Sequence, residues 1–427
     1  MDFRNASRSL HALAGATALL LTTAMAVAQS EPTIKDETKS EVLERVTRLL
    51  TRSAFVPGID FSKWPSFVEA DKEKIDAAKT DDDFQRAVNG ALYKFGASHI
   101  VLSTPKAAET RRTGQSVGVG ITTQQSEEGL IVVRTVKDAP ADKAGLRPGD
   151  VIVSVDGQPV EGIKGIPGAE GTTVVLTVKR GTDAPKDYSV KRAKFSTVRP
   201  EELTWLDKDT AKLNVYTFDF TYDAERVEKY MKEANRARNL ILDLRDNGGG
   251  AVVNLEHLLG MLLPPDKPIG TFISKSLVNR YRLETGEDAT DLAKVAEFSD
   301  SKITPRLNKR VPRYKGNLVV LVNRWSGSAS EIAAAALRDV AGAQVVGTKS
   351  AGAVLVSVIV DASNGFRLQY PLSDYVTIKG QRLEGSGVAP DIEVADPKLR
   401  LPDTKDEVVE KAREQLAKAK SREIGSR

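Results

Sequence analysis

Two apolar runs, each ending in a turn of small residues that leads into a helical pattern, constrain the fold of this chain most strongly. One run, Leu240 to Leu244, continues into three consecutive glycines, Gly248 to Gly250. The other, Leu318 to Val322, continues through Trp-Ser-Gly-Ser into a helical pattern at 329–341. Mainly apolar runs of this kind are typical of strands buried on both faces, and their alternation with helical patterns at 224–237 and 252–263 predicts an α/β core.

The rest of the chain divides according to its hydrophobic periodicity. Residues 36–55 and 81–95 have apolar positions at helical spacing, whereas 114–194 consists of short alternating runs broken by glycine and proline. A capping box, Thr404 to Glu407, precedes an amphipathic closing helix. We therefore predict a helical N-terminal domain at 29–112, a small β-rich domain at 113–194, the α/β core at 195–400 and a C-terminal helix at 401–427.

The first 28 residues have the pattern of a secretory signal. Arg4 and Arg8 precede an apolar run from Leu10 to Val27, which ends in Ala-Val-Ala at residue 28. The alternative is a membrane anchor, but the run is alanine-rich and shorter than the roughly 20 residues that a spanning helix needs. The chain also has no cysteine, which excludes disulfides, thiolate nucleophiles and lipid attachment at a lipobox cysteine. We expect cleavage after Ala28, export to a periplasm and no membrane segment in the mature chain.

Charge and composition indicate a globular protein without an electrostatic preference for one class of partner. The formal charge of +4 results from 62 basic and 58 acidic side chains distributed along the chain. Such a balance does not predict nucleic acid as a partner. No motif in the sequence implies a metal or a cofactor, and the oligomeric state cannot be derived from the sequence.

The serine at position 328 lies where a buried strand leads into a helix. There the first amides of the helix and its dipole favour developing negative charge, as an oxyanion requires. A non-catalytic alternative is that Ser328 and Glu331 form a capping box. The Gly248–Gly250 turn could likewise form an oxyanion hole, an anion-binding nest or a tight turn that requires positive φ.

Four motifs together resemble the C-terminal processing (tail-specific) serine peptidase family, including its tricorn-like branch. They are Leu-Asp-Leu-Arg-Asp-Asn-Gly-Gly-Gly at 242–250, Ser-Gly-Ser-Ala-Ser-Glu-Ile at 326–332, Val-Val-Gly at 345–347 and Leu-Glu-Gly-Ser-Gly-Val-Ala-Pro-Asp-Ile at 383–392. The resemblance implies a ClpP/crotonase-like α/β core with an inserted PDZ-like domain. It also implies Ser328 as the nucleophile and an oxyanion hole formed by the amides of Gly249 and Ala329.

One departure from the better-known members of that family concerns the general base. Those members have a lysine 25 residues after the serine, and this chain has Ala353 there. A methyl group cannot accept a proton, and Lys349 would need specific burial to do so. The tricorn-like branch instead uses a Ser-His pair before the PDZ-like domain and a later glutamate.

Three residues of this chain match the tricorn-like pattern. They are Ser98, His99 and Glu384. The resemblance implies that His99 is the base, that Glu384 fixes its tautomer and that Ser98 orients the site. The other histidine outside the signal, His257, falls between leucines of a helical pattern and is interpreted as structural.

The β-rich block resembles a bacterial PDZ domain that lacks one element. Its loop at Val117–Ile121, with Val119, Gly120 and Ile121, would dock a substrate carboxylate by analogy. Between Val160 and Gly171, however, glycines and Pro167 replace the long helix that normally lines the peptide groove. The domain would then either bind C-terminal peptides or only pack on the active site as a lid or gate.

These features predict an exported serine endopeptidase that cleaves unfolded or C-terminal protein segments through a Ser328 acyl-enzyme. Two alternatives from other classes stay open. Ala353 is compatible with a catalytically inactive PDZ-containing scaffold of the same family. The glycine turn alone is compatible with a periplasmic protein that binds a small anion.

Overall fold

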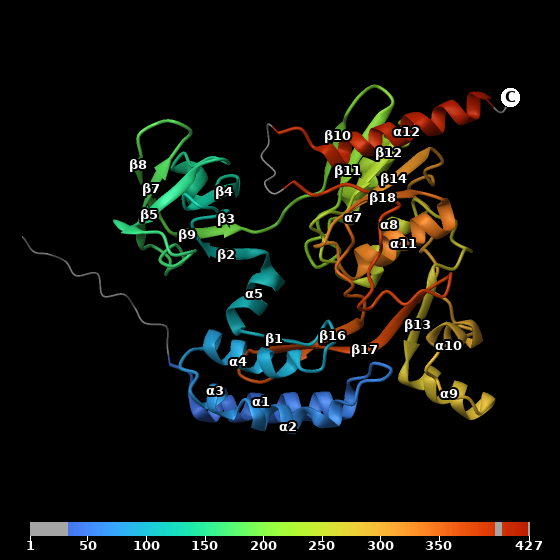
Figure 1. Cartoon of the computed structure of the whole chain (residues 1–427), viewed down its shortest axis with the longest axis horizontal. Helices are drawn as coiled ribbons and strands as arrows, with labels where there is room; N and C mark the ends of the chain where they lie inside the picture. Colours follow the sequence, from blue (N-terminus) through green and yellow to red (C-terminus); the bar gives the residue numbers. More distant parts are fainter. Residues whose placement is uncertain (1–32, 398–403, 426–427) are drawn as a thin grey trace, which may run out of the picture. The chain divides into compact units, whose positions relative to one another are not determined.

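The computed structural model describes residues 33–397 and 404–425, with side chains up to residue 418 (Figure 1). The predicted signal segment, residues 1–28, lies outside the described residues. Within the described residues, no helix has the length and apolarity needed to cross a membrane. The chain combines helices with four β-sheets, which confirms the predicted mixed α/β class.

A six-stranded sheet forms the centre of the α/β core. The strands β11, β12, β14, β15 and β18 run parallel, and β10 pairs with β11 in the antiparallel sense. Because β12 and β14 are parallel neighbours, the two small-residue turns that follow them lie at the same edge of the sheet. In sheet order, the strands are β10 (Glu202–Trp205), β11 (Thr210–Asn214), β12 (Asn239–Asp243), β14 (Asn317–Val322), β15 (Gln344–Gly347) and β18 (Ile392–Glu393).

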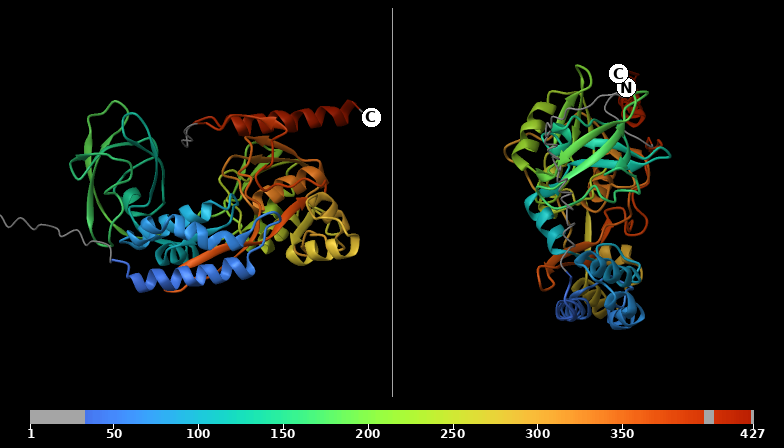
Figure 2. Two further views of the ribbon diagram at one scale, coloured as in Figure 1. Left: turned by 60° about the horizontal axis from the view of Figure 1, so that its bottom comes forward. Right: turned by 90° about the vertical axis from the view of Figure 1, so that its left-hand side faces the viewer.

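Helices cover both faces of this sheet, which explains why its central strands β12 and β14 are mainly apolar on both faces. Leu240 and Leu242 of β12 pack in the cluster formed with α7, α8 and α11, whereas Ile241 packs with Val408 of α12 on the other face. Figures 1 and 2 show α12 in red along the sheet. These helices are α7 (Ala224–Ala234), α8 (Val252–Leu259), α11 (Ala329–Ala341) and α12 (Glu407–Gly425).

A second sheet joins the N-terminal helices to the later part of the core. Its long strand β17 pairs with β1, β13 and β16. The cluster around Trp64 and Phe84 of the N-terminal helices includes Phe366 and Leu368, so the helices and this sheet share one hydrophobic core. The strands are β1 (Val101–Ser103), β13 (Gly270–Ser274), β16 (Val356–Asp361) and β17 (Arg367–Thr377).

Six helices and a 3-10 turn pack around this second sheet. The side chain of Asn89 in α4 donates to the Leu102 carbonyl and accepts from the Leu102 amide. These two hydrogen bonds hold β1, the strand that follows residues 98 and 99, against α4. Helices α9 and α10 contact β13. The helices are α1 (Asp36–Ser53), α2 (Trp64–Ala70), α3 (Lys72–Asp76), α4 (Asp81–Tyr93), α9 (Lys275–Thr285) and α10 (Leu292–Phe298), and the turn is η1 (Phe61–Lys63).

The β-rich block has a hydrophobic core of its own, built from residues between Val119 and Val190. Two further strands precede and follow this block in the sequence and pair with each other. They are β2 (Gln115–Gly118) and β9 (Ala193–Ser196), and α5 (Pro105–Thr113) leads into β2. The elements of the block are β3 (Ile121–Gln125), β4 (Leu130–Thr135), α6 (Pro140–Lys143), β5 (Val151–Val155), β6 (Gln158–Pro159), β7 (Thr173–Lys179) and β8 (Lys186–Lys191).

The segment between β6 and β7 has no helix, as its glycines and Pro167 predict. The buried Arg192 holds it instead. Its guanidinium donates to the carbonyls of Gly165 and Ile166 at 2.6 and 2.9 Å and to the Thr172 hydroxyl at 2.9 Å. The hydrogen bonds of a buried guanidinium therefore hold this segment in place in the absence of a helix.

Replacing this arginine should loosen the segment. In Arg192→Ala the carbonyls of Gly165 and Ile166 lose a charged donor, so we expect a loss of about 2–3 kcal/mol in the unfolding free energy of the β-rich block. Urea unfolding and the rate of proteolysis within residues 160–172 measure this loss. The adjacent exposed Lys191, changed to alanine, serves as the control. Equal stability and equal proteolysis of both variants would contradict the anchoring role of Arg192.

Candidate active site

Ser328 lies at the N-terminus of α11 with φ 53° and ψ −117°. A positive φ at a residue with a side chain costs about 1–3 kcal/mol and is maintained only by surrounding contacts. Here the Ser328 amide donates to the Ala353 carbonyl at 2.8 Å and to Glu331 Oε2 at 3.0 Å. The turn is therefore held through its backbone, which leaves the hydroxyl of Ser328 for another contact.

The structure distinguishes the three serines of this turn. The Ser326 hydroxyl is buried and donates to the Leu244 carbonyl at 2.8 Å. The Ser330 hydroxyl is also buried and has no hydrogen-bond partner among the described residues. Only the half-buried Ser328 faces an ionisable side chain, because its Oγ lies 3.1 Å from Nε2 of His99.

His99 belongs to a chain of four hydrogen-bonded side chains. Its Nδ1 lies 2.7 Å from Oγ of Ser98, and that hydroxyl lies 2.9 Å from Oε2 of Glu384. A carboxylate only accepts hydrogen bonds, so Ser98 donates to Glu384 and in turn accepts from the Nδ1–H of His99. This assignment leaves Nε2 without a proton and able to accept from the hydroxyl of Ser328.

The carboxylate of Glu384 also accepts hydrogen bonds from two backbone amides. Its Oε1 accepts from the Ser98 amide at 2.9 Å, and its Oε2 accepts from the Val354 amide at 2.8 Å. The sequence predicted that Glu384 would orient His99. In the structure the Ser98 hydroxyl lies between them, so the glutamate acts on the imidazole through Ser98.

The environment of His99 disfavours its charged form. Burial lowers the pKa of His99 below its ordinary value of 6.5, and the positive charge of Arg111 lowers it further. The negative charge of Glu384 opposes both effects and raises the pKa. The net effect is a lowered pKa, so the imidazole is mainly neutral near pH 7.

Glu331 holds the loop at residues 350–353, which includes Ala353. Its buried carboxylate accepts from the Ser350 hydroxyl at 2.5 Å and from the amides of Gly352 and Ala353 at 2.8 and 2.9 Å. Burial raises the pKa of Glu331, and these hydrogen bonds act in the opposite direction. Glu331 thus holds the nucleophile turn to the 350–353 loop, beyond the capping role considered from the sequence.

Lys349 is exposed, and no hydrogen bond joins it to Ser328 within the described residues. His257 contacts Tyr222 Oη at 2.8 Å and Glu228 Oε1 at 3.1 Å. These contacts fit the structural role expected for His257. No group of three or more histidine, aspartate or glutamate side chains that could hold a metal ion occurs in the described part of the chain.

The glycine turn lies directly against Ser328. Gly249 has φ +94°, and a Cβ at this position would lie 2.6 Å from the Cβ of Ser328, so only glycine fits. Its amide, however, donates to Oδ1 of the buried Asn247 at 2.9 Å. By contrast, Ala329 provides the first amide of α11, a position without an intrahelical acceptor.

Asn247 is a residue of the site that sequence reasoning missed. Its side chain also donates to the Val215 carbonyl, and its own carbonyl accepts from the Gly327 amide. The asparagine in the Asp-Asn-Gly-Gly-Gly motif was visible in the sequence, but nothing local indicated that it would join the glycine turn to the serine turn.

The three residues predicted to bind a peptide carboxylate lie in the β-rich block. Val119 is buried in the core of this block, and its carbonyl accepts from the Ala141 amide. The Gly120 carbonyl accepts from the Val136 amide, and Ile121 begins the edge strand β3. The carbonyls of Val119 and Gly120 are therefore engaged within the block, and the outer edge of β3 has no paired strand among the described residues.

Comparisons with known proteins agree with the fold and the motifs. Residues 209–394 match the model of peptidase family S41, and residues 131–180 match that of the PDZ domain. The chain is 29% identical over 298 residues to a probable CtpA-like serine protease of Staphylococcus haemolyticus (strain JCSC1435). This alignment covers 67% of the chain but 54% of that protein, so the chain spans about half the length of this curated relative.

Two solved structures share the fold. The structure of mature CPAF complexed with lactacystin has a TM-score of 0.53 at 17% identity, covering 90% of this chain and 98% of that chain. A putative S41 protease from Bacteroides fragilis NCTC 9343 has a TM-score of 0.53 at 16% identity, covering 73% and 88%. Residues 209–394 of this chain are therefore similar to peptidase family S41, and residues 131–180 are similar to a PDZ domain.

Proposed function

We propose that this chain is an exported serine endopeptidase of the Ser/His/Glu branch, and that it cleaves unfolded or C-terminal protein segments. The observation that carries the proposal is the continuous series of hydrogen bonds from Ser328 through His99 and Ser98 to Glu384. A nucleophile, a base and a group that orients the base, all within hydrogen-bond distance, are the geometry that acyl transfer requires.

In the proposed reaction, His99 Nε2 takes the proton of the Ser328 hydroxyl as its oxygen attacks the substrate carbonyl. The imidazolium is stabilised by the Nδ1–H bond to Ser98, whose own proton points to Glu384. His99 then returns the proton to the leaving amine, and a water repeats these steps to release the acyl group from Ser328.

The Ala329 amide at the start of α11 is the proposed donor to the oxyanion, and the helix dipole adds to its effect. The Gly249 amide is the proposed second donor. In the structure the Gly249 amide donates to Asn247 Oδ1 at 2.9 Å. We propose that the developing oxyanion replaces Asn247 Oδ1 as the acceptor or shares this donor with it.

The alternatives to this peptidase have less support. A lysine base has no candidate, because Ala353 holds the Ser328 amide through its carbonyl and Lys349 is exposed. A small-anion site is supported by the glycine motif alone, whereas the position of Gly249 directly against Ser328 fits a donor to an oxyanion formed at that serine. The inactive scaffold rests on Ala353 alone, and the hydrogen-bonded series from Ser328 to Glu384 argues against it.

Export to a periplasm is proposed from residues 1–28 and from the absence of cysteine. An unfolded polypeptide is the proposed substrate because the PDZ domain has an edge strand, β3, at which an extended chain could add. The segment held by Arg192 takes the place of the groove helix, so recognition would rest mainly on backbone pairing.

Substitutions should separate the roles of the site residues. We expect Ser328→Ala and His99→Ala to lower kcat by a factor on the order of 10³ or more on a labelled unfolded polypeptide. Ser98→Ala should lower kcat about 10- to 100-fold, because the imidazole loses its orienting partner. Lys349→Ala should keep the full rate and is the matched control. Full activity of His99→Ala, or loss in Lys349→Ala, would refute His99 as the base.

The pH profile gives an independent test. The pKa of His99 is lowered, and the base must be neutral, so kcat/KM should rise with pH through a midpoint below about 6.5 and be level at neutral pH. Glu384→Gln removes the charge that raises this pKa and should move the midpoint further down. A midpoint well above pH 7 would indicate a base other than His99.

A further inference from the structure

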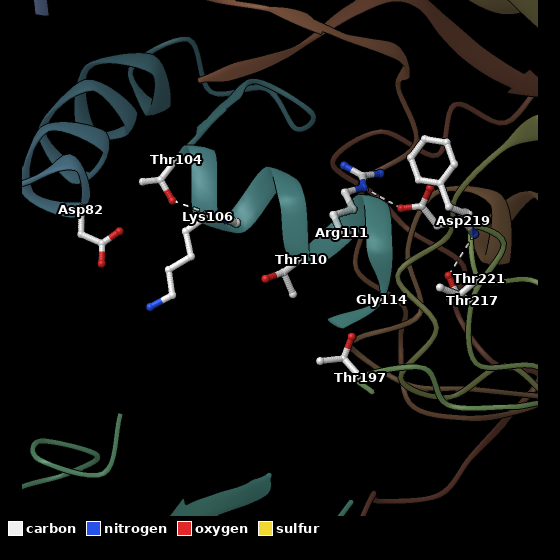
Figure 3. Close-up of a pocket in the computed structure, with 12 residues that line it drawn as sticks. Asp82, Thr104, Lys106, Thr110, Arg111, Gly114, Thr197, Thr217, Asp219 and Thr221 are labelled. Carbon is white, nitrogen blue, oxygen red and sulfur yellow. Dashed lines mark hydrogen bonds and ion pairs between the residues drawn. The ribbon is translucent and has the colours of Figure 1, made fainter. Parts of the chain in front are cut away.

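A cavity of about 490 Å³ opens beside the site, between helix α5 and the loop at residues 217–221 (Figure 3). Threonines line much of it, and Phe220, which is 71% exposed, stands at its edge. Its charged groups are Lys106, Arg111, Asp219 and Asp82. The proposed mechanism uses none of these residues in the chemical step.

Backbone contacts connect this cavity to the nucleophile. The Phe218 amide donates to the Gly249 carbonyl at 2.8 Å, and the Asp219 backbone packs against Gly250. Gly249 in turn lies against Ser328. The wall of the cavity formed by residues 217–221 is therefore continuous with the glycine turn beside Ser328.

Arg111 is the residue of the cavity with unused hydrogen-bonding capacity. Its Nε lies 2.6 Å from Oδ2 of Asp219, but its two terminal amino groups have no hydrogen-bond partner within the described residues. Figure 3 shows these terminal nitrogens turned away from Asp219. The side chain is 41% exposed, so a ligand can reach it.

The chemistry of this guanidinium favours a carboxylate. Two parallel N–H groups match the two oxygens of a carboxylate, and such charge-assisted bonds are about twice as strong as neutral ones. The charge of Arg111 also disfavours protonation of His99. A carboxylate bound to Arg111 would offset that effect at the moment when His99 accepts the serine proton.

We infer that this cavity is a substrate subsite and that Arg111 selects a carboxylate of the substrate there. The carboxylate comes either from an acidic side chain or from the C-terminus of the polypeptide. The inference rests on the proposed peptidase function, because it places the substrate of Ser328 in the cavity. Asp219 holds the guanidinium in position through Nε and leaves the terminal nitrogens for the ligand.

The test uses two series of labelled peptides of one unfolded sequence. In the first, a single Glu moves stepwise along the peptide, each matched by a peptide with Gln. In the second, the C-terminus is free or amidated. We expect kcat/KM to be about 10-fold higher for the acidic member at one position, or for the free C-terminus, which identifies the source of the carboxylate. Arg111→Gln should abolish this preference.

Matched variants separate charge selection from a general structural effect. Arg112→Gln, at a neighbouring exposed arginine paired with Glu109, should keep the preference. Asp219→Asn weakens the bond that positions Arg111 through Nε and should reduce the preference, and Arg111→Lys should retain part of it. No difference between acidic and neutral peptides at any position, or the same preference in Arg111→Gln, would overturn the inference.

Binding measurements distinguish failure of this inference from failure of the proposed function. The Ser328→Ala variant binds without turnover, so fluorescence anisotropy with the same peptides reports the preference of Arg111 even if no peptide is cleaved. Preferential binding of acidic peptides without any cleavage by the wild-type chain would support the subsite and refute the peptidase proposal. Cleavage of all peptides with equal binding would refute only the subsite.

Discussion

The arrangement of this site depends on the carboxylate of Glu384. It accepts hydrogen bonds from Ser98 and from Val354, and so joins segments that lie 286 and 30 residues away in the sequence. Within the described residues, the Ser98 hydroxyl has hydrogen bonds only to Glu384 and to the imidazole of His99, so Glu384 fixes its orientation. Because a carboxylate only accepts hydrogen bonds, it also determines which atom is the donor in each hydrogen bond of the series that ends at Ser328. One acidic side chain therefore fixes both the geometry of the site and the tautomer of its histidine.

A second carboxylate, Glu331, has the corresponding role for the nucleophile. It binds the Ser328 amide and the amides of the 350–353 loop, and it holds a positive φ that would otherwise be unfavourable. The 350–353 loop thus acts as a backbone support for Ser328. Both the carbonyl and the amide of Ala353 take part in these hydrogen bonds.

Opposing charges act on the pKa of His99. Glu384 favours the imidazolium, whereas burial and Arg111 favour the neutral ring. Arg111 lies on α5, directly before the strand that leads into the PDZ domain. Its ion pair with Asp219 links that helix to the loop beside the glycine turn. In the proposed function and the proposed subsite, this one cation would act both on the pKa of His99 and on a carboxylate of the substrate.

The sequence by itself determined the features that depend on local patterns. Apolar periodicity predicted the strands and helices of the core, the small residues around Ser328 predicted a strand–helix turn, and Pro167 with its neighbouring glycines excluded a groove helix. Only the tertiary structure decided the contacts between distant segments: Ser98 between His99 and Glu384, Asn247 on the Gly249 amide, and Arg111 against Asp219. Periodicity and turn chemistry act over a few residues, whereas these hydrogen bonds form only after the two sheets and their helices have packed.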